Sequence, residues 1–359
     1  MKHMTLHRRD FLKTSLLGGL ALGLPWGGRR LLAAAEPSAA PAAAGGLSRV
    51  AVTAGEDRAD LAFQGLKQFA GPIAAAIGDK RVIIKPNNVV TTNPLCASDA
   101  KNLEGILEFL HSIGKDKNVV IAESPSNGPA VTGFDNYGYT PLAAKYGAKL
   151  FDLDQDGFET FACIDETDFR PHFCRAAKTL LDPNNYIISA AKFKTHDRVV
   201  ATLSLKNIVV GAAIKRGGGE GPLGGPWGNS DKPVIHGGGF RGLNYNIFAM
   251  AGRLHPDLAV IDGYEGMEGT GPVNGTPVNS RVCVVSPDWL AADRVALELM
   301  GIDFTKVGYL TYCARAGLGE SDLARIEILG PALKEHIKTY QLPRNFDQQM
   351  IWMQPMKNG

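Results

Sequence analysis

The chain has 359 residues, of which 45% are hydrophobic and 21% charged, and its formal net charge is +2. These proportions are ordinary for a folded globular protein and exclude a collagen-like or largely disordered chain. Six basic residues and one acidic residue among the first 35 give that segment a charge of +5, so the remainder carries −3. The remainder therefore lacks the basic field that nucleic-acid binding needs, and we expect no nucleic-acid partner.

The first 35 residues have the features of a twin-arginine signal peptide. Arg8 and Arg9 precede an apolar run over residues 14–24, and small residues follow at 33–35. The run is shorter than the roughly 20 residues that a membrane-spanning helix needs. We predict a signal peptide over residues 1–35 and export of the folded chain by the twin-arginine translocase. The product would be periplasmic or otherwise extracytoplasmic, with no membrane span in the mature chain.

An Ala- and Pro-rich linker over residues 36–47 precedes an alternation of short apolar runs and helical patterns. The apolar runs predict strands at 49–53, 81–85, 118–122, 149–153, 185–190, 257–262, 281–285 and 325–329. The helical patterns lie at 57–77, 99–113, 140–146, 244–254 and 289–300. This order predicts an α/β fold, a mostly parallel sheet flanked by helices, in one domain over 48–330. A C-terminal extension, 331–359, is expected to lie against that domain.

Two segments depart from this alternation. Residues 158–175 have a less regular pattern, which indicates a hairpin insertion or a small second subdomain. Residues 211–242 are rich in glycine and lack periodicity. Long segments of this kind are usually functional loops or disordered. We therefore expect a Gly-rich loop insertion that acts as a lid over a ligand or is disordered.

Polar residues follow four of the predicted strands. In open parallel sheets, ligands bind beyond the carboxyl ends of the strands, so these residues are candidates for one common pocket. They are Lys85, Asn87 and Asn88; Glu123; Lys192, Lys194 and His196; and Asp262, Glu265 and Glu268. Each group taken alone is equally typical of an ordinary solvated turn.

The basic group is the most specific of the four. Lys192, Lys194 and Lys206 together with His196 would suit an anion such as a carboxylate or phosphate. A neutral imidazole can also act as a general base or bind a transition metal. The alternative is a solvated basic loop with a hydrogen-bonded histidine.

The acidic group lies in a glycine-rich segment. Asp262, Glu265 and Glu268 could bind a divalent cation through oxygen, although their spacing is not that of an EF-hand. They could equally accept hydrogen bonds from the basic group across the pocket. The five cysteines contain no Cys-x-x-Cys pair, so no ferredoxin-type iron–sulfur motif is present. Cys163 and Cys174 could form a disulfide in an oxidising compartment, or remain buried thiols.

Several of these motifs resemble the domain of unknown function 362 (DUF-362) family in order and spacing. The resemblance covers about Val50 to Gly330, and some members of that family carry ferredoxin-like cysteine clusters, which this chain lacks. The matching motifs are Lys85-Pro86-Asn87, Glu123-Ser124-Pro125, Lys192 to His196, Ser204 to Asn207, Asp262 to Pro272 with Gly275, Ser286 to Asp288, Asp293 to Ala296 and Met300 to Asp303.

A shorter segment resembles the nickel-pincer lactate racemases. His196 precedes Lys206 by ten residues, with Gly211 beyond. That resemblance implies a proton-transfer role for His196 and an anchoring role for Lys206. Pro222 occupies the position of the family's nickel-binding histidine, and the next histidine is His236. The resemblance therefore implies a shared scaffold and not the pincer cofactor.

Together these features predict an exported enzyme that acts on a small anionic substrate, a carboxylate or phosphate, by acid/base chemistry with possible assistance from a divalent metal. His196, Lys206 and Glu123 would be catalytic, and Asp262, Glu265 and Glu268 would hold the metal. The substrate-binding residues would be Lys85, Asn87, Asn88, Lys192, Lys194 and Asn207. The alternatives are a non-catalytic periplasmic protein that binds a metal or an anion, and an assembly partner of an exported redox protein.

Overall fold

The computed structural model describes residues 46–215 and 230–355, all within one compact unit, 37–359. The predicted signal peptide, most of the linker and the centre of the Gly-rich segment lie outside the described residues. Among those described, no helix is long and apolar enough to cross a membrane.

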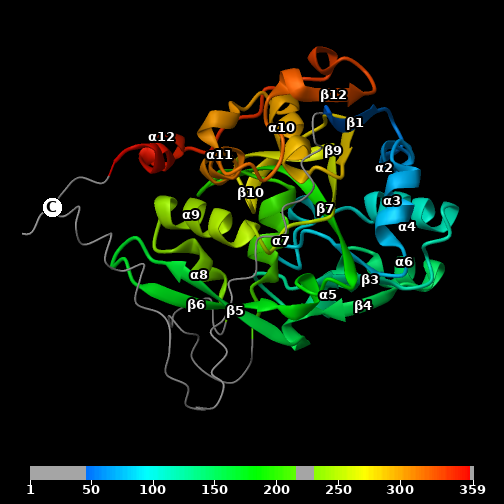
Figure 1. Cartoon of the computed structure of the whole chain (residues 1–359), viewed down its shortest axis with the longest axis horizontal. Helices are drawn as coiled ribbons and strands as arrows, with labels where there is room; N and C mark the ends of the chain where they lie inside the picture. The colour runs from blue at the N-terminus through cyan, green and yellow to red at the C-terminus, as the bar shows by residue number, and fades with distance from the viewer. Residues whose placement is uncertain (1–45, 216–229, 356–359) are drawn as a thin grey trace, which may run out of the picture. The chain divides into compact units, whose positions relative to one another are not determined.

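A 10-stranded mixed sheet forms the centre of the unit (Figure 1). Its main path runs β12-β1-β11-β9-β7-β2-β3-β4, and β8 and β10 pair with β7 and β9. All neighbours along the main path are parallel except β1–β11 and β11–β9. The strands are β1 (Ser48–Ala54), β2 (Arg81–Lys85), β3 (Val119–Glu123), β4 (Lys149–Asp152), β7 (Asn185–His196), β8 (Val200–Thr202), β9 (Leu258–Thr270), β10 (Asn274–Val278), β11 (Val282–Ser286) and β12 (Ile326–Leu329). The predicted fold class, an α/β protein with a mostly parallel sheet flanked by helices, is confirmed.

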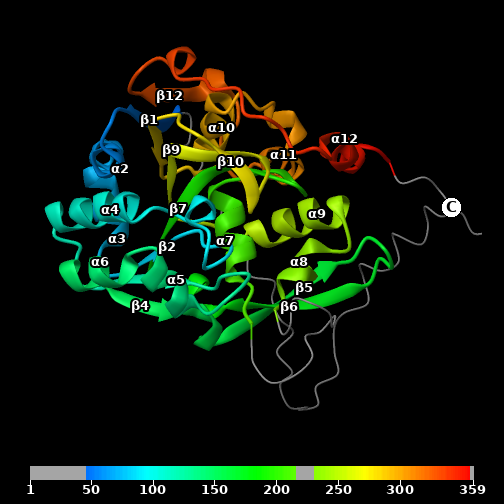
Figure 2. The same cartoon turned by 180° about the vertical axis from the view of Figure 1, so that it is seen from behind.

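Helices cover both faces of the sheet (Figures 1 and 2). One face carries α2 (Arg58–Lys67), α3 (Ala70–Ile77), α4 (Ala100–Ser112), α5 (Ala130–Asn136) and α6 (Tyr139–Tyr146). The other face carries α7 (Ser204–Ala212), α8 (Lys232–His236), α9 (Phe240–Ala251), α10 (Trp289–Leu299) and α11 (Gly308–Arg315). A short α12 (Phe346–Gln349) follows near the C-terminus.

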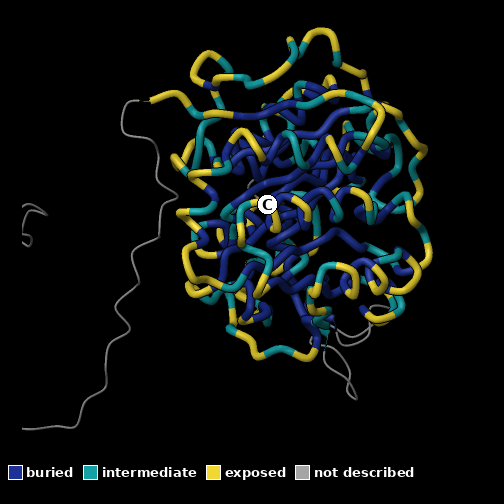
Figure 3. The backbone as a smooth tube through the Cα atoms, turned by 90° about the vertical axis from the view of Figure 1, so that its right-hand side faces the viewer, coloured by how far each residue is buried: buried dark blue, intermediate teal, exposed yellow. Residues whose placement is uncertain are grey.

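The alternation of side chains along the strands divides the core into two clusters. On β2, Val82 and Ile84 pack under α2–α6, whereas Ile83 between them packs under α7–α11. This is the period-2 pattern of a strand buried on both faces, and it explains why the central strands are continuously apolar. Buried backbone accordingly runs through the middle of the unit, with exposed segments at its periphery (Figure 3).

The single helix predicted over residues 57–77 is two helices. α2 begins at the N-cap Asp57, whose carboxylate accepts from the amides of Ala59 and Asp60, and ends at Lys67. Pro72 has no N–H to donate to the carbonyl four residues earlier, so it cannot continue that helix and instead lies in the first turn of α3.

Two strands continue well beyond their predicted ends. β7 runs on to His196 and β9 to Thr270, and each then folds back, with β8 and β10 respectively. Lys192, Lys194 and His196 therefore lie within a strand and not in the loop after one. Their polar side chains indicated a strand end because the sequence pattern alone does not show that the carbonyls of Cys96 and Ala97 accept from these lysines inside the protein.

The predicted hairpin insertion is present as a separate two-stranded antiparallel sheet of β5 (Phe158–Ile164) and β6 (Pro171–Ala177). Cys163 and Cys174 on it are buried free thiols. The Gly-rich segment is partly helical, since α8 and the start of α9 lie within residues 230–242. In the C-terminal extension, the Gln349 side chain accepts a hydrogen bond from the Val200 amide at 2.7 Å, which attaches it to the β7–β8 turn.

Candidate functional site

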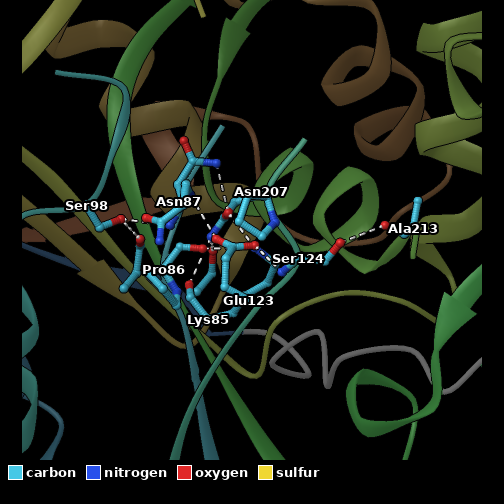
Figure 4. Close-up of polar contacts among 12 residues, drawn as sticks. Lys85, Pro86, Asn87, Ser98, Glu123, Ser124, Asn207 and Ala213 are labelled. Carbon is cyan, nitrogen blue, oxygen red and sulfur yellow. Dashed lines mark hydrogen bonds and ion pairs between the residues drawn. The ribbon is translucent and has the colours of Figure 1, made fainter. Parts of the chain in front are cut away.

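A buried ion pair lies where β2 and β3 end (Figure 4). Lys85 Nζ is 2.7 Å from Glu123 Oε1, and each side chain is only 1% exposed. The other Glu123 oxygen accepts from the Asn88 amide at 2.8 Å, and Oε1 also accepts from the Ser124 amide. Burial lowers the pKa of Lys85, and the Glu123 carboxylate opposes that shift. The pair is thus neutral as a unit and fully hydrogen-bonded.

Asn207, on the first turns of α7, completes this arrangement (Figure 4). Its Oδ1 accepts from Asn87 Nδ2 at 3.0 Å and from Lys85 Nζ at 3.3 Å. Its Nδ2 donates to the Lys85 carbonyl at 3.1 Å and to Ser189 Oγ at 3.0 Å. We call Lys85, Asn87, Glu123 and Asn207 the cavity floor.

Helix α7 passes so close to the floor that it needs a glycine. A Cβ on Gly211 would overlap the end of the Lys85 side chain. Gly211 lets the helix backbone approach Lys85 while that ammonium keeps its bond to Glu123.

Above the floor is a cavity of about 630 Å³, within the range typical of small-molecule sites. Besides the floor residues and Asn88, its lining includes His196 at the end of β7, Lys206 on α7, and Lys232 and His236 on α8. We call these last four residues the cavity wall. Asp197, Arg198 and the 270–274 turn also line the cavity.

The two wall histidines are held in complementary tautomers. His196 Nδ1 accepts the Arg198 amide at 3.0 Å, so a neutral His196 carries its proton on Nε2. His236 Nδ1 lies 2.7 Å from the Lys232 carbonyl, which can only accept, so a neutral His236 has its lone pair on Nε2. Burial, followed by the charge of Lys206, lowers the pKa of His196 well below its ordinary value and that of His236 to about 4. Both rings are neutral at pH 7, one as a donor and the other as an acceptor.

The wall lysines have no carboxylate within ion-pair distance in the described part of the chain. Lys232 Nζ donates to Ser124 Oγ at 3.0 Å and to the Ala213 carbonyl at 2.5 Å. Lys206 is 6% exposed, and within residues 46–215 and 230–355 its Nζ has neither a hydrogen bond nor an ion pair. Burial lowers the pKa of Lys206 to about 8 and that of Lys232 to about 7. An anion in the cavity would supply the partner that these amines lack.

The model of the family described as Domain of unknown function (DUF362) matches residues 82–298, which include the whole floor and wall. The chain belongs to the DUF362 family. It is also 24% identical, over 256 residues and 71% of each chain, to the Thylakoid-associated protein sll1697 of Synechocystis sp.. No solved structure matches the chain.

Two lysines predicted to bind substrate in this DUF362 chain lie behind the floor. Lys194 is fully buried and donates to Asn87 Oδ1 and to the Cys96 carbonyl. Lys192 is directed to the Ala97 carbonyl at 3.4 Å. Neither lines the cavity. Their role in the structure is to hold the loop that follows β2 against β7, because buried ammonium groups need acceptors.

The three predicted metal ligands also lie away from the cavity. Asp262, beside Lys192 in the β7–β9 register, forms an ion pair with Arg58 at 3.6 Å, and burial raises its pKa to about 6. Glu268 accepts from the Gln341 amide at 2.8 Å. In residues 46–215 and 230–355, no group of three or more His, Cys, Asp or Glu side chains could hold a metal ion, so the metal prediction gains no support.

Sequence reasoning missed half of the wall. Lys232 and His236 lie in the Gly-rich segment, where no helix was predicted. Their i, i+4 spacing was the available signal, since it places two side chains on one face of a helix. Pro233 in the first turn favours such a helix.

Proposed function

We propose that this chain is an enzyme that acts on a small anionic substrate, a carboxylate or phosphate, by acid/base chemistry in the cavity. The observation that carries the proposal is the cavity wall, where two amines without carboxylate partners in the described ranges line the same cavity as two histidines. A metal is not needed for any part of it.

Substrate binding follows from charge. The floor pair is already neutral, so Lys206 and Lys232, the wall amines without a carboxylate partner in the described ranges, provide the attraction for an anion. Because their side chains are buried, these charges act through a medium of lower polarity than water, which strengthens their attraction for a bound anion.

Acid/base chemistry follows from the two histidines. His236 presents a lone pair that can take a proton from a substrate, and the imidazolium so formed can return that proton at another position. His196 presents an N–H that can donate a hydrogen bond to a substrate oxygen on which negative charge develops. Groups whose pKa values differ from ordinary because of burial and nearby charge are frequent at catalytic sites.

The first test is a thermal-unfolding screen of the purified chain with small carboxylates and phosphate esters. A true ligand present at 100 times its dissociation constant should stabilise the fold by about 2.7 kcal/mol. Each stabilising compound is then incubated with the protein and followed by NMR for product. His196→Ala should lower turnover by about 10²- to 10⁴-fold while leaving the fold intact. His111→Ala is the matched control, because the His111 side chain is exposed and, among the described residues, pairs with Asp116.

The screen also distinguishes the alternatives. Stabilisation by an anion without any product would favour a non-catalytic anion-binding protein. Equal turnover by wild type and His196→Ala would contradict the acid/base assignment. No stabilisation by any carboxylate or phosphate would contradict anion binding and favour an assembly role beside a redox partner.

We further propose that the chain is exported through the twin-arginine translocase and works in the periplasm or an equivalent compartment. Arg8 and Arg9 with the apolar run that follows support this. Replacing both with Lys should leave the protein in the cytoplasmic fraction, whereas Arg29→Lys with Arg30→Lys should not. Export of the Arg8/Arg9 variant at the normal level would contradict the proposal.

A further inference from the structure

We propose that Lys206 is a nucleophile that forms an imine with the carbonyl group of a small 2-oxo acid. The inference rests on the proposed function, since it needs an anion in the cavity, and it adds the class of substrate and a covalent step.

The geometric basis is the position of the amine. Lys206 is more than nine-tenths buried, faces the cavity, and has no partner for Nζ in the described ranges. Other buried lysines differ in this respect: Lys85 bonds to Glu123, Lys194 to Asn87, and Lys232 to Ser124. A buried amine without a hydrogen-bond partner is destabilising, and its retention at a cavity favours a functional role.

The amine is also available in its reactive form. Only the neutral amine attacks a carbonyl carbon, and burial brings the pKa of Lys206 to about 8 against the attraction of Asp197. A useful fraction is therefore neutral near pH 7.

The step balances without any further reactant. Nζ forms a bond to the carbonyl carbon, the C=O π electrons move to oxygen, and the proton that Nζ loses passes to that oxygen to give a carbinolamine. The hydroxyl group then takes one proton from solvent and leaves as water, which gives a protonated imine. His196, with its proton on Nε2, lines the same cavity and can donate a hydrogen bond to that oxygen, and the Lys206 charge acts on both wall histidines. Hydrolysis reverses the step and regenerates the amine.

Arg198 favours a carboxylate beside the carbonyl. It lines the cavity, its charge acts on His196, Asp197 and His236, and it has no ion pair within 4 Å in the described ranges. A guanidinium binds a carboxylate through two parallel hydrogen bonds. A 2-oxo acid has these two groups on adjacent carbons, which suits a cavity lined by both Arg198 and Lys206.

The test is reductive trapping. The full chain is incubated with pyruvate or glyoxylate and sodium cyanoborohydride, and then analysed by intact mass and peptide mapping. We expect a single reduced adduct on Lys206, with a rate of formation that reaches half its maximum near pH 8. Lys194 is an internal control, because its pKa is also lowered, to about 7, but it does not line the cavity.

Lys206→Arg keeps the charge but not the nucleophile, so it should lose the adduct. No adduct on the wild type, or adducts spread over exposed lysines and unchanged in Lys206→Arg, would overturn the inference. Peptide mapping of the wild-type protein tests the inference even if Lys206→Arg fails to fold. Stabilisation by succinate or phosphate, with no reduced adduct from either oxo acid, would contradict imine formation but not the proposed function. No stabilisation by any of these anions would contradict both.

Discussion

The floor and the wall of the cavity both contain buried lysines, but they differ in whether these lysines have a carboxylate partner. At the floor, Lys85 and Glu123 neutralise each other, and Asn207 bonds to both the Lys85 side chain and its backbone. At the wall, Lys206 and Lys232 have no carboxylate partner within the described ranges, and the two histidines are kept neutral. The comparison teaches that a charged residue near a cavity indicates ligand binding only when its partner is missing. A neutral, fully hydrogen-bonded network makes this part of the protein rigid, whereas amines without a carboxylate partner are able to bind an anion.

The largest expected effect on stability comes from removing one partner of the buried ion pair in the cavity floor. Glu123→Gln leaves the Lys85 ammonium buried without a counter-charge, and we expect a loss of about 3–5 kcal/mol in the free energy of unfolding. Urea denaturation measures it. Glu104→Gln is the matched control, because the Lys145–Glu104 pair is largely exposed and should change stability by less than about 1 kcal/mol. Similar losses from the two variants would contradict the account of the floor.

A substitution at the wall should change the free energy of unfolding in the opposite direction. Lys206→Met removes a buried amine that has no described partner, and at pH 7 it should stabilise the fold by as much as about 3 kcal/mol. Lys206 has a pKa of about 8 in the folded chain against an ordinary 10.5, so the unfolded chain binds more protons between these values. Wild-type stability therefore rises across that window, and the advantage of the variant should shrink from pH 8 to 10.5.

Lys194→Met is the comparison variant for that experiment. Lys194 is equally buried, but its loss leaves Asn87 Oδ1 and the Cys96 carbonyl without their donor, so the fold should be destabilised. Thermal or urea unfolding of both variants, side by side, measures the difference. Destabilisation by Lys206→Met as well would show that Lys206 has a structural partner.

The smallest effect concerns the contact between helix α7 and the floor. Gly211→Ala should displace the end of Lys85 and cost about 1–3 kcal/mol, even though alanine is the better helix former. Gly71→Ala, in α3 with open space around it, should instead stabilise by up to about 1 kcal/mol. Stabilisation by both substitutions would show that Lys85 can move without loss.

The sequence was sufficient for the fold class and for part of the site. Unbroken apolar runs such as 81–85 predict buried parallel strands, and the polar residues after them, Lys85 and Glu123, form the floor as the strand-end rule implies. His196 and Lys206, also named from the sequence, line the cavity above the floor.

The remainder depends on tertiary contacts that a linear pattern does not carry. Lys192 and Lys194 are typical of a solvated loop, yet the carbonyls of residues 96 and 97 bind them inside the protein. Asp262 was grouped with its acidic neighbours, although its ion-pair partner is Arg58, about 200 positions away. The opposing charge thus comes from helix α2, which the linear pattern around Asp262 does not show.

The most direct test of the central claim is ¹⁵N NMR of the imidazole nitrogens of His196 and His236, with and without a small carboxylate. At pH 6 we expect two neutral rings, protonated on Nε2 in His196 and on Nδ1 in His236, because both pKa values are lowered. Their signals should shift saturably as the carboxylate fills the cavity. Imidazolium rings at pH 6, or signals that do not respond to any small anion, would contradict the account.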